Sequence, residues 1–230
     1  MCSKSDFTEP PKFQSSSLTL IFGQSGSGKS TWLTDCLIEH NIHFERKVKQ
    51  LIYVSKHTDK NVKKLKSKFK AGMFINEIPT NLEQILEPSK TVIVFDDCQQ
   101  ELLQSKEKIR MLKRLATISI HHDDLMVFIT FQDYEIFYKR NELNFLLFQT
   151  SCIILFRSLN NFCSLKRFLN SYEVKLKGGE TLYNLFKKFV QGQPFSHIII
   201  NLSTKLKCPQ VYSQILFCDD RPLLIFHEEE

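Results

Sequence analysis

The chain has 230 residues, 42% of them hydrophobic, and a formal net charge of +6. This length is enough to bury a large core in one domain, and the cationic balance suits an anionic partner. Seven cysteines without a C-x-x-C pair argue against a disulfide framework and a zinc ribbon. No apolar run reaches the roughly 18 to 20 residues of a membrane span. We therefore expect a protein with reduced cysteines that is neither secreted nor membrane-spanning.

The first 17 residues are polar and contain Pro10-Pro11, so we expect a flexible segment over residues 1–17 and a single domain over residues 18–230. From Leu18 onward, apolar runs typical of strands alternate with helical stretches. Strands are expected at residues 50–55, 73–76, 91–97, 126–132 and 152–157, with closing strands at 197–202 and 211–217. The alternation predicts an α/β fold, with a central, mostly parallel sheet flanked by helices and closing antiparallel strands at the C-terminus.

A glycine-rich segment follows the apolar run Leu18-Thr19-Leu20-Ile21-Phe22. It reads Gly23-Gln24-Ser25-Gly26-Ser27-Gly28-Lys29-Ser30 and matches the phosphate-binding pattern G-x-x-x-x-G-K-[ST], known as Walker A. The glycines of such a loop let backbone N–H groups converge on phosphate oxygens, with a helix N-terminus behind them. We expect Lys29 to reach the β- and γ-phosphates, Ser30 to ligate Mg²⁺, and the binding segment to extend to Thr31. The motif therefore predicts a site for a nucleoside triphosphate.

Two adjacent carboxylates end the apolar run of residues 91–97. Ligands bind at this edge of an α/β sheet, and the segment is typical of a Walker B strand. We expect Asp96 to hold Mg²⁺. Asp97 should point the opposite way, because strand side chains alternate, and should polarise the attacking water. Gln132 ends another predicted strand, and its amide can donate to a γ-phosphate oxygen while accepting from a water, so it is the candidate sensor.

His121-His122 and the following Asp123-Asp124 form a possible metal-binding group. Adjacent residues on an extended segment point in opposite directions, so two neighbouring imidazoles would rarely meet one ion. We therefore favour a role for the histidine pair at a loop or subunit contact.

Residues 60–70 contain six lysines around three apolar positions, which predicts a helix with one buried stripe and a cationic remainder. Such a face can contact the phosphate backbone of DNA or simply be solvated. No base-reading motif accompanies it, so any DNA binding is expected to be independent of sequence.

Together these elements resemble the packaging ATPases of the HerA and FtsK superfamily, found in large DNA viruses and in Maverick/Polinton elements. The resemblance runs from about Leu18 to Phe226, and includes residues 73–79 and the histidine pair before Gln132. It implies an additional-strand P-loop NTPase of the RecA/FtsK-like type that uses ATP and Mg²⁺. In this family the first acidic residue serves Mg²⁺, the second activates water and the glutamine senses the γ-phosphate, which implies these roles for Asp96, Asp97 and Gln132.

The resemblance also implies a motor. Members assemble as homo-oligomeric rings, here expected to be a pentamer or hexamer, and move double-stranded DNA into a viral or virus-like capsid. The implied partners are DNA, copies of the chain itself and a capsid vertex or capsid protein; the implied location is the host cytoplasm or nucleus, or the virion. Family members insert an arginine into the neighbouring subunit's site. A gapless comparison places Asn144 there, so Arg140, four residues upstream, is the candidate, with Arg110, Arg114 and Arg157 as alternatives.

Two other classes of function share a phosphate-binding loop. A small phosphotransferase of the nucleotide-kinase type should carry an arginine-rich lid, whereas this chain is richer in lysine. A nucleotide-controlled binding switch should carry an N-K-x-D segment that reads guanine, and the sequence has none. Adenine is therefore the expected base.

Overall fold

The computed structural model describes residues 12–86, 91–157, 162–170, 181–190, 195–202, 210–213 and 224–226. Their strands form one sheet in the order β3-β2-β4-β5-β1-β6-β7-β8-β9. The strands are β1 (Ser17–Phe22), β2 (Gln50–Ser55), β3 (Met73–Ile75), β4 (Thr91–Asp96), β5 (Met126–Phe131), β6 (Cys152–Phe156), β7 (His197–Asn201), β8 (Gln210–Ser213) and β9 (Leu224–Phe226). Pairing is parallel from β3 to β6 and antiparallel from β6 to β9. The predicted α/β architecture is confirmed. Of the strand expected at residues 211–217, residues 214–217 lie outside the described part.

Strand β5 lies between β1 and β4, and pairs in parallel with both. It is the additional strand that the resemblance implied. Because the carboxyl ends of parallel strands meet at one edge, this order brings three segments together: the glycine-rich loop after β1, the carboxylates at the end of β4 and the amide after β5.

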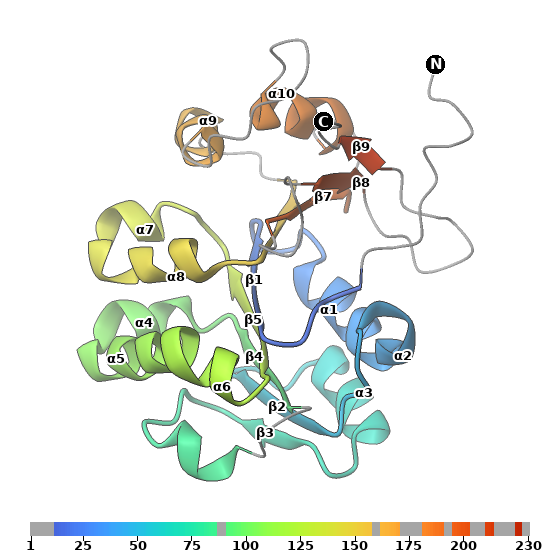
Figure 1. Ribbon diagram of the computed structural model, residues 1–230, viewed down its shortest axis with the longest axis vertical. Helices are drawn as coiled ribbons and strands as arrows, with labels where there is room; N and C mark the ends of the chain where they lie inside the picture. Colours follow the sequence, from blue (N-terminus) through green and yellow to red (C-terminus); the bar gives the residue numbers. More distant parts are fainter. Residues whose placement is uncertain are drawn as a thin grey trace.

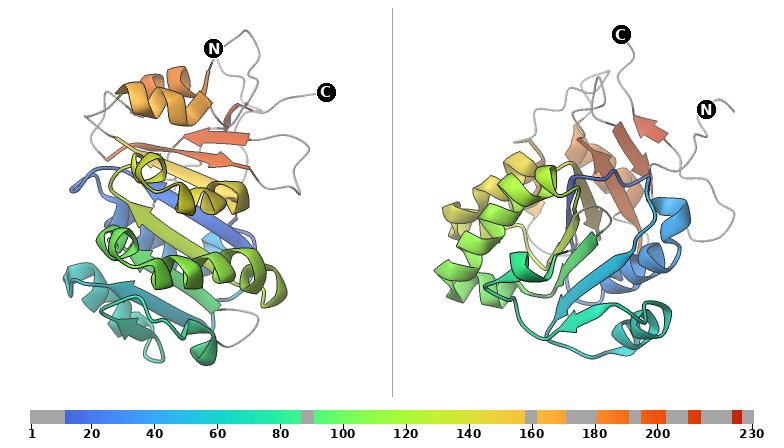
Figure 2. Two further views of the ribbon diagram at one scale, coloured as in Figure 1. Left: turned by 90° about the vertical axis from the view of Figure 1, so that its left-hand side faces the viewer. Right: turned by 60° about the horizontal axis from the view of Figure 1, so that its bottom comes forward.

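Helices cover both faces of the sheet (Figures 1 and 2). Helices α1, α2 and α3 lie on one face, and α4 to α8 lie on the other. The helices are α1 (Lys29–Ile38), α2 (His40–His43), α3 (Lys60–Lys68), α4 (Gln99–Gln104), α5 (Lys106–Arg114), α6 (Ile120–His122), α7 (Ile136–Lys139), α8 (Asn144–Gln149), α9 (Phe162–Asn170) and α10 (Leu182–Val190), with short 3-10 turns η2 (Leu82–Ile85) and η4 (Asn141–Leu143) and a π-helical turn η3 (Leu115–Ser119). No helix in the described ranges combines the length and apolar character needed to cross a bilayer.

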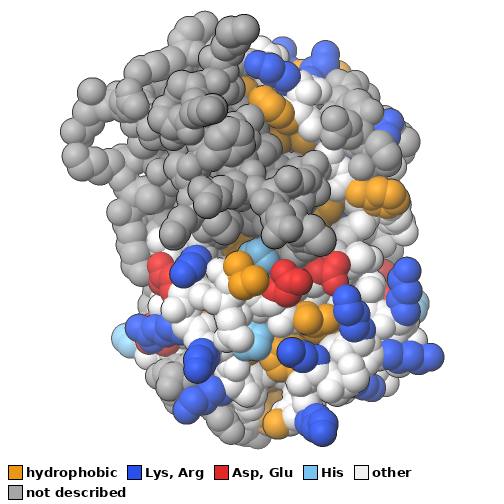
Figure 3. Space-filling model, turned by 90° about the vertical axis from the view of Figure 1, so that its right-hand side faces the viewer, with side chains coloured by type: hydrophobic (Ala, Val, Ile, Leu, Met, Phe, Trp, Pro, Cys, Tyr) orange, Lys and Arg blue, Asp and Glu red, His pale blue; other side chains and the backbone are white. Residues whose placement is uncertain are grey.

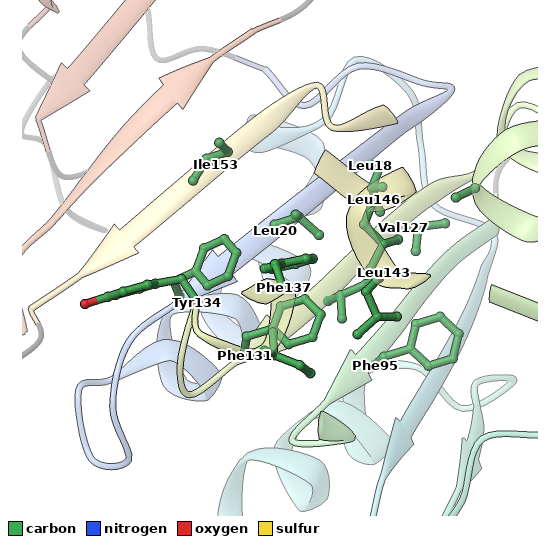
Figure 4. Packing of buried hydrophobic residues seen from close by; sticks show 14 of the residues in the cluster. Leu18, Leu20, Phe95, Val127, Phe131, Tyr134, Phe137, Leu143, Leu146 and Ile153 are labelled. Atoms are coloured by element: carbon green, nitrogen blue, oxygen red, sulfur yellow. The ribbon is translucent and has the colours of Figure 1, made fainter. Parts of the chain in front are cut away.

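The core consists of two apolar layers, one on each face of the sheet. Every residue of β1, β4 and β5 is buried, which explains why β4 and β5 read as nearly continuous apolar runs. On the α4–α8 face the ring of Phe131 stacks on Phe22, with centroids 5.6 Å apart, and meets Phe137 edge-on at 5.4 Å. Figure 4 shows Phe131 and Phe137 packed beside Leu143 on this face.

Within the segment expected to be flexible, Phe13 packs onto the α1–α3 face. Phe13 is only 6% exposed, and its ring centroid lies 5.2 Å from that of Phe128 and 5.5 Å from that of Phe44. Its backbone N–H donates to the carbonyl of His43 at 2.7 Å, and β1 begins at Ser17. A single aromatic residue among polar ones creates no periodic signal, so no pattern in the sequence indicated this packing.

Candidate nucleotide-binding site

A cavity of about 300 Å³ opens at the edge of the sheet where β1, β4 and β5 end. Its lining comprises Ser25, Gly26, Gly28, Lys29, Ser30, Thr31, Asp59, Asn61, Asp96, Asp97, Thr130, Gln132 and Phe195. The structure therefore gathers most of the candidate residues of the glycine-rich loop, both aspartates and the glutamine around one space. The remaining loop candidates, Gly23, Gln24 and Ser27, are not among the lining residues.

The glycine-rich loop depends on backbone conformations that favour glycine. Gly26 and Gly28 have φ values of 78° and 97°, in the left-handed region that side chains disfavour. Gly23 is restricted by space: a Cβ there would lie 2.7 Å from Cβ of Phe156 and from Oγ of Ser27. Helix α1 begins directly after Gly28, and the first N–H groups of a helix have no partner within it. The loop is thus built to bring main-chain amides close to an anion.

The Lys29 side chain folds back onto its own loop. Its Nζ donates to the carbonyl oxygens of Gly23 at 2.5 Å and Gln24 at 3.0 Å, and the residue is only 8% exposed. Burial lowers the pKa of Lys29, and the nearby carboxylates of Asp96 and Asp97 act in the opposite direction. A partly desolvated cation at the cavity wall is well suited to bind an anionic ligand.

Asp96 is a buried carboxylate, 6% exposed, held by three hydroxyl groups. Its Oδ1 accepts from Oγ1 of Thr130 at 2.7 Å and from Oγ of Ser30 at 3.1 Å, and its Oδ2 accepts from the Tyr53 hydroxyl at 2.7 Å. Burial, and then the Asp96 charge, raise the pKa of Tyr53, so the phenol remains a donor. Carboxylate and hydroxyl oxygens are ligands that Mg²⁺ prefers, so Ser30 and Asp96 fit that ion.

Asp97 leaves the strand and is oriented by a turn. β4 ends at Asp96, and Asp97 has φ 54°, so its separate direction does not come from the alternation expected along an extended strand. Its N–H donates to Oγ1 of Thr130 at 3.0 Å, and its Oδ1 accepts from Nε2 of Gln132 at 2.7 Å. The imidazole of His57 lies 4.0 Å from Oδ2. The Asp97 side chain is 41% exposed and lines the cavity, so it can contact a water there.

Gln132 is fixed through both its backbone and its side chain. Its N–H donates to Oε1 of Gln99 in α4 at 3.0 Å, while its amide reaches Asp97. Sequence reasoning missed Thr130, although it lies two positions before Gln132 and strand alternation places both on one side of β5. It also missed Tyr53, whose relevance depends on β2 being the neighbour of β4.

Arg140 lies away from the cavity lining. It follows α7, and its Nη2 donates to the carbonyl of Leu103, which connects it to the helical layer of its own chain. Of the alternative arginines, Arg110 and Arg114 are exposed on α5, and Arg157 follows β6.

The histidine pair at residues 121 and 122 ends the short helix α6, so the extended conformation assumed from the sequence is wrong. Within the described ranges, no group of three or more His, Cys, Asp and Glu side chains is placed to hold a metal ion.

Neither a protein-family model nor a curated protein matches the sequence. Solved structures do match the fold. B204, the DNA-packaging ATPase from Sulfolobus Turreted Icosahedral Virus, is similar over 91% of this chain and 100% of its own length, with a TM-score of 0.51 and 13% identity. The fold is that of a P-loop ATPase.

Two further ATPase structures match most of this chain. EssC (ATPases 2 and 3) from Geobacillus thermodenitrificans matches 94% of this chain with a TM-score of 0.53 and 14% identity. EccC (ATPases 2 and 3) from Thermomonospora curvata, a type VII secretion ATPase, matches 93% with a TM-score of 0.51 and 12% identity. This chain spans 41% and 37% of those two chains, respectively, but the full length of B204. At these identities the likeness establishes the fold.

Proposed function

We propose that this chain is the ATP-hydrolysing subunit of a DNA-packaging motor, which forms a homo-oligomeric ring and drives double-stranded DNA into a viral or virus-like capsid. The observation that carries the proposal is the convergence of Lys29, Ser30, Asp96, Asp97 and Gln132 on one cavity. The inference that the chain hydrolyses ATP rests on these residues. DNA movement and the capsid partner rest on the resemblance to packaging ATPases and on the fold shared with B204 over its whole length.

The cavity fits the triphosphate of ATP. Its volume of about 300 Å³ lies at the lower end of small-molecule pockets. The loop amides and Lys29 would hold the β- and γ-phosphates, and Ser30 and Asp96 would hold Mg²⁺. When bound, Mg²⁺ would neutralise charge that develops on the phosphate oxygens.

In the proposed reaction the two aspartates have different tasks because their environments differ. Asp96 is buried and held by hydroxyl donors, which suits a fixed ligand. Asp97 is exposed to the cavity and would accept a proton from the attacking water, while Gln132 would orient that water toward the γ-phosphate. Arg140 would have to release the Leu103 carbonyl before it could serve a neighbouring subunit.

DNA contact is proposed for the cationic surface around α3. Its lysines are exposed, and the buried stripe is formed by Asn61, Val62 and Leu65. Figure 3, which looks at the α1–α3 side, shows Lys and Arg side chains spread over this face with acidic side chains among them. Lys64 already pairs with Asp35 at 2.7 Å, so the remaining lysines are the better candidates for phosphate contacts.

The deciding experiment is the ATPase rate with and without double-stranded DNA over a salt series. We expect stimulation that fades as salt rises, because phosphate contacts release counterions. Lys63→Gln combined with Lys68→Gln should make the slope of log affinity for DNA against log salt shallower, by about 0.9 for each phosphate that the variant no longer neutralises. Lys29→Ala should abolish turnover with or without DNA.

Other outcomes would point to other functions. Transfer of phosphate to a nucleotide acceptor without any effect of DNA would favour the kinase alternative. Nucleotide-dependent DNA binding without turnover would favour a switch. Stimulation by a peptide in place of DNA would favour a role closer to that of the secretion ATPases, since EccC was captured with a signal sequence peptide.

A further inference from the structure

The cavity has an aromatic end that the phosphate chemistry does not use. Phe195 lines it, and this large apolar side chain is 65% exposed. A Cβ placed on Gly28 would lie 3.2 Å from Cδ1 of Phe195, so the edge of the ring lies directly against the glycine-rich loop. The ring is therefore a neighbour of the proposed phosphate site.

The sheet order places Phe195 on the side of the loop opposite the carboxylates. Asp96 ends β4, which is separated from β1 by β5, whereas Phe195 precedes β7, which is separated from β1 by β6. Because β7 runs antiparallel to β6, with His197 opposite Phe156, its beginning lies at the edge where the parallel strands end. A nucleotide with its γ-phosphate near the carboxylates would extend its base toward Phe195.

Phe195 is held in a backbone conformation that is rare for its residue type. Its φ of 62° lies in the left-handed region. The adjoining residues fix it there: Oγ of Ser196 donates to the carbonyl of Val190 at 2.9 Å, and the N–H of Arg157 donates to the carbonyl of Ser196 at 3.3 Å. Strained backbone positions of this kind cluster at ligand sites, and Phe195 lines the cavity, so its conformation points to a contact with the ligand.

We propose, on the basis of the proposed function, that Phe195 is the platform on which the base of the bound nucleotide stacks. An aromatic face stacks on any base, because every base has a π-face. Phe195 therefore adds affinity for adenine and guanine nucleotides alike.

The test compares ATP with inorganic tripolyphosphate, which keeps the phosphates and lacks the base. Calorimetry with Mg²⁺ is performed on the wild type, Phe195→Ala, Phe195→Trp and the control Phe148→Ala; Phe148 is 85% exposed and does not line the cavity. Phe195→Ala should weaken ATP binding by about 5- to 150-fold, the range for removal of one base–aromatic stack. Its affinity for tripolyphosphate should not change, and Phe195→Trp should bind ATP like the wild type.

Two results would overturn the stacking role while leaving the phosphate site intact. One is an unchanged ATP affinity in Phe195→Ala. The other is a wild type that binds tripolyphosphate as tightly as ATP. An equal weakening for both ligands in Phe195→Ala would also overturn it, since the ring would then only support the loop. A wild type that binds neither ligand would refute the proposed function itself, and the stacking role with it.

Discussion

The side-chain amide of Gln132 donates a 2.7 Å hydrogen bond to Oδ1 of Asp97. The proposed sensor and the proposed base are therefore in direct contact. A γ-phosphate oxygen that accepts from the same Nε2 would compete with the carboxylate for this donor. Arrival of the triphosphate would thus free Asp97 to accept a proton from water.

Asp97→Asn should separate binding from chemistry. The amide keeps the size of the side chain but cannot act as a base, so we expect ATP affinity to be retained and kcat to fall by about 10²- to 10⁴-fold. Calorimetry and a phosphate-release assay measure the two quantities. Lys29→Ala is the comparison, because it should lose both binding and turnover. Normal turnover by Asp97→Asn would eliminate the proposed base.

Tyr53→Phe should destabilise the protein through Asp96. The substitution leaves Oδ2 of a buried carboxylate without the hydroxyl that donates to it, at a cost of about 1–3 kcal/mol in the free energy of unfolding. Urea denaturation measures the change. Tyr138→Phe is the control, because Tyr138 is exposed and should tolerate the loss of its hydroxyl. Equal stabilities for Tyr53→Phe and the wild type would show that this hydrogen bond contributes nothing.

Stability should decrease in mild acid because of His197. Its ring stacks on Phe156 at a centroid distance of 4.6 Å, and burial lowers its pKa from 6.5 to about 4. Between these values the unfolded chain binds a proton that the folded chain does not, so the free energy of unfolding falls as pH drops from 6.5 toward 4. The contribution between pH 7 and pH 5 is about 2 kcal/mol.

The matched variant for this pH effect is His197→Phe, which keeps an aromatic ring in the stack and removes the titrating group. Urea denaturation at pH 7 and pH 5 should show that the variant loses about 2 kcal/mol less stability than the wild type over this interval. Identical losses in the two proteins would assign the acid sensitivity to other groups.

Arg140→Ala tests whether a residue acts across subunits. In mixtures with the wild type, an arginine that completes a neighbour's site should inhibit the ring more than in proportion to the mutant fraction, since such arginines contribute about 10³- to 10⁵-fold to turnover. Lys113→Ala, on the exposed surface of α5, is the control, because Lys113 is not among the candidate arginines. A strictly proportional decline would show that Arg140 only supports its own chain through Leu103.

Much of the fold could be predicted because local patterns specify it. Parallel strands buried on both faces read as unbroken apolar runs, and β2, β4, β5 and β6 appear within a residue or two of the expected positions. The loop after β1 was recognisable because its glycines and Lys29 have a fixed spacing. Strand order depends on long-range pairing, so the contact between Tyr53 and Asp96 could not be derived from local sequence.

Other parts of the site depend on backbone geometry that no sequence pattern predicts. From the sequence, Asp97 reads as the last residue of a strand, whereas it forms a turn; Asp is compatible with both conformations. Phe195 precedes an ordinary apolar run, and it reaches the cavity because β7 runs antiparallel to β6. The burial of Phe13 has no signal in the sequence, because one aromatic residue among polar ones creates no periodic pattern.

The position of β5 also sets the distance between the ends of β1 and β4. Neighbouring strands lie about 4.8 Å apart, so inserting one strand between β1 and β4 places their ends roughly 10 Å from each other. Direct pairing of those two strands would halve that gap. The wider interval leaves room for a solvent molecule between the glycine-rich loop, which carries Lys29, and the turn at Asp97. The end of β5 lies beneath this space.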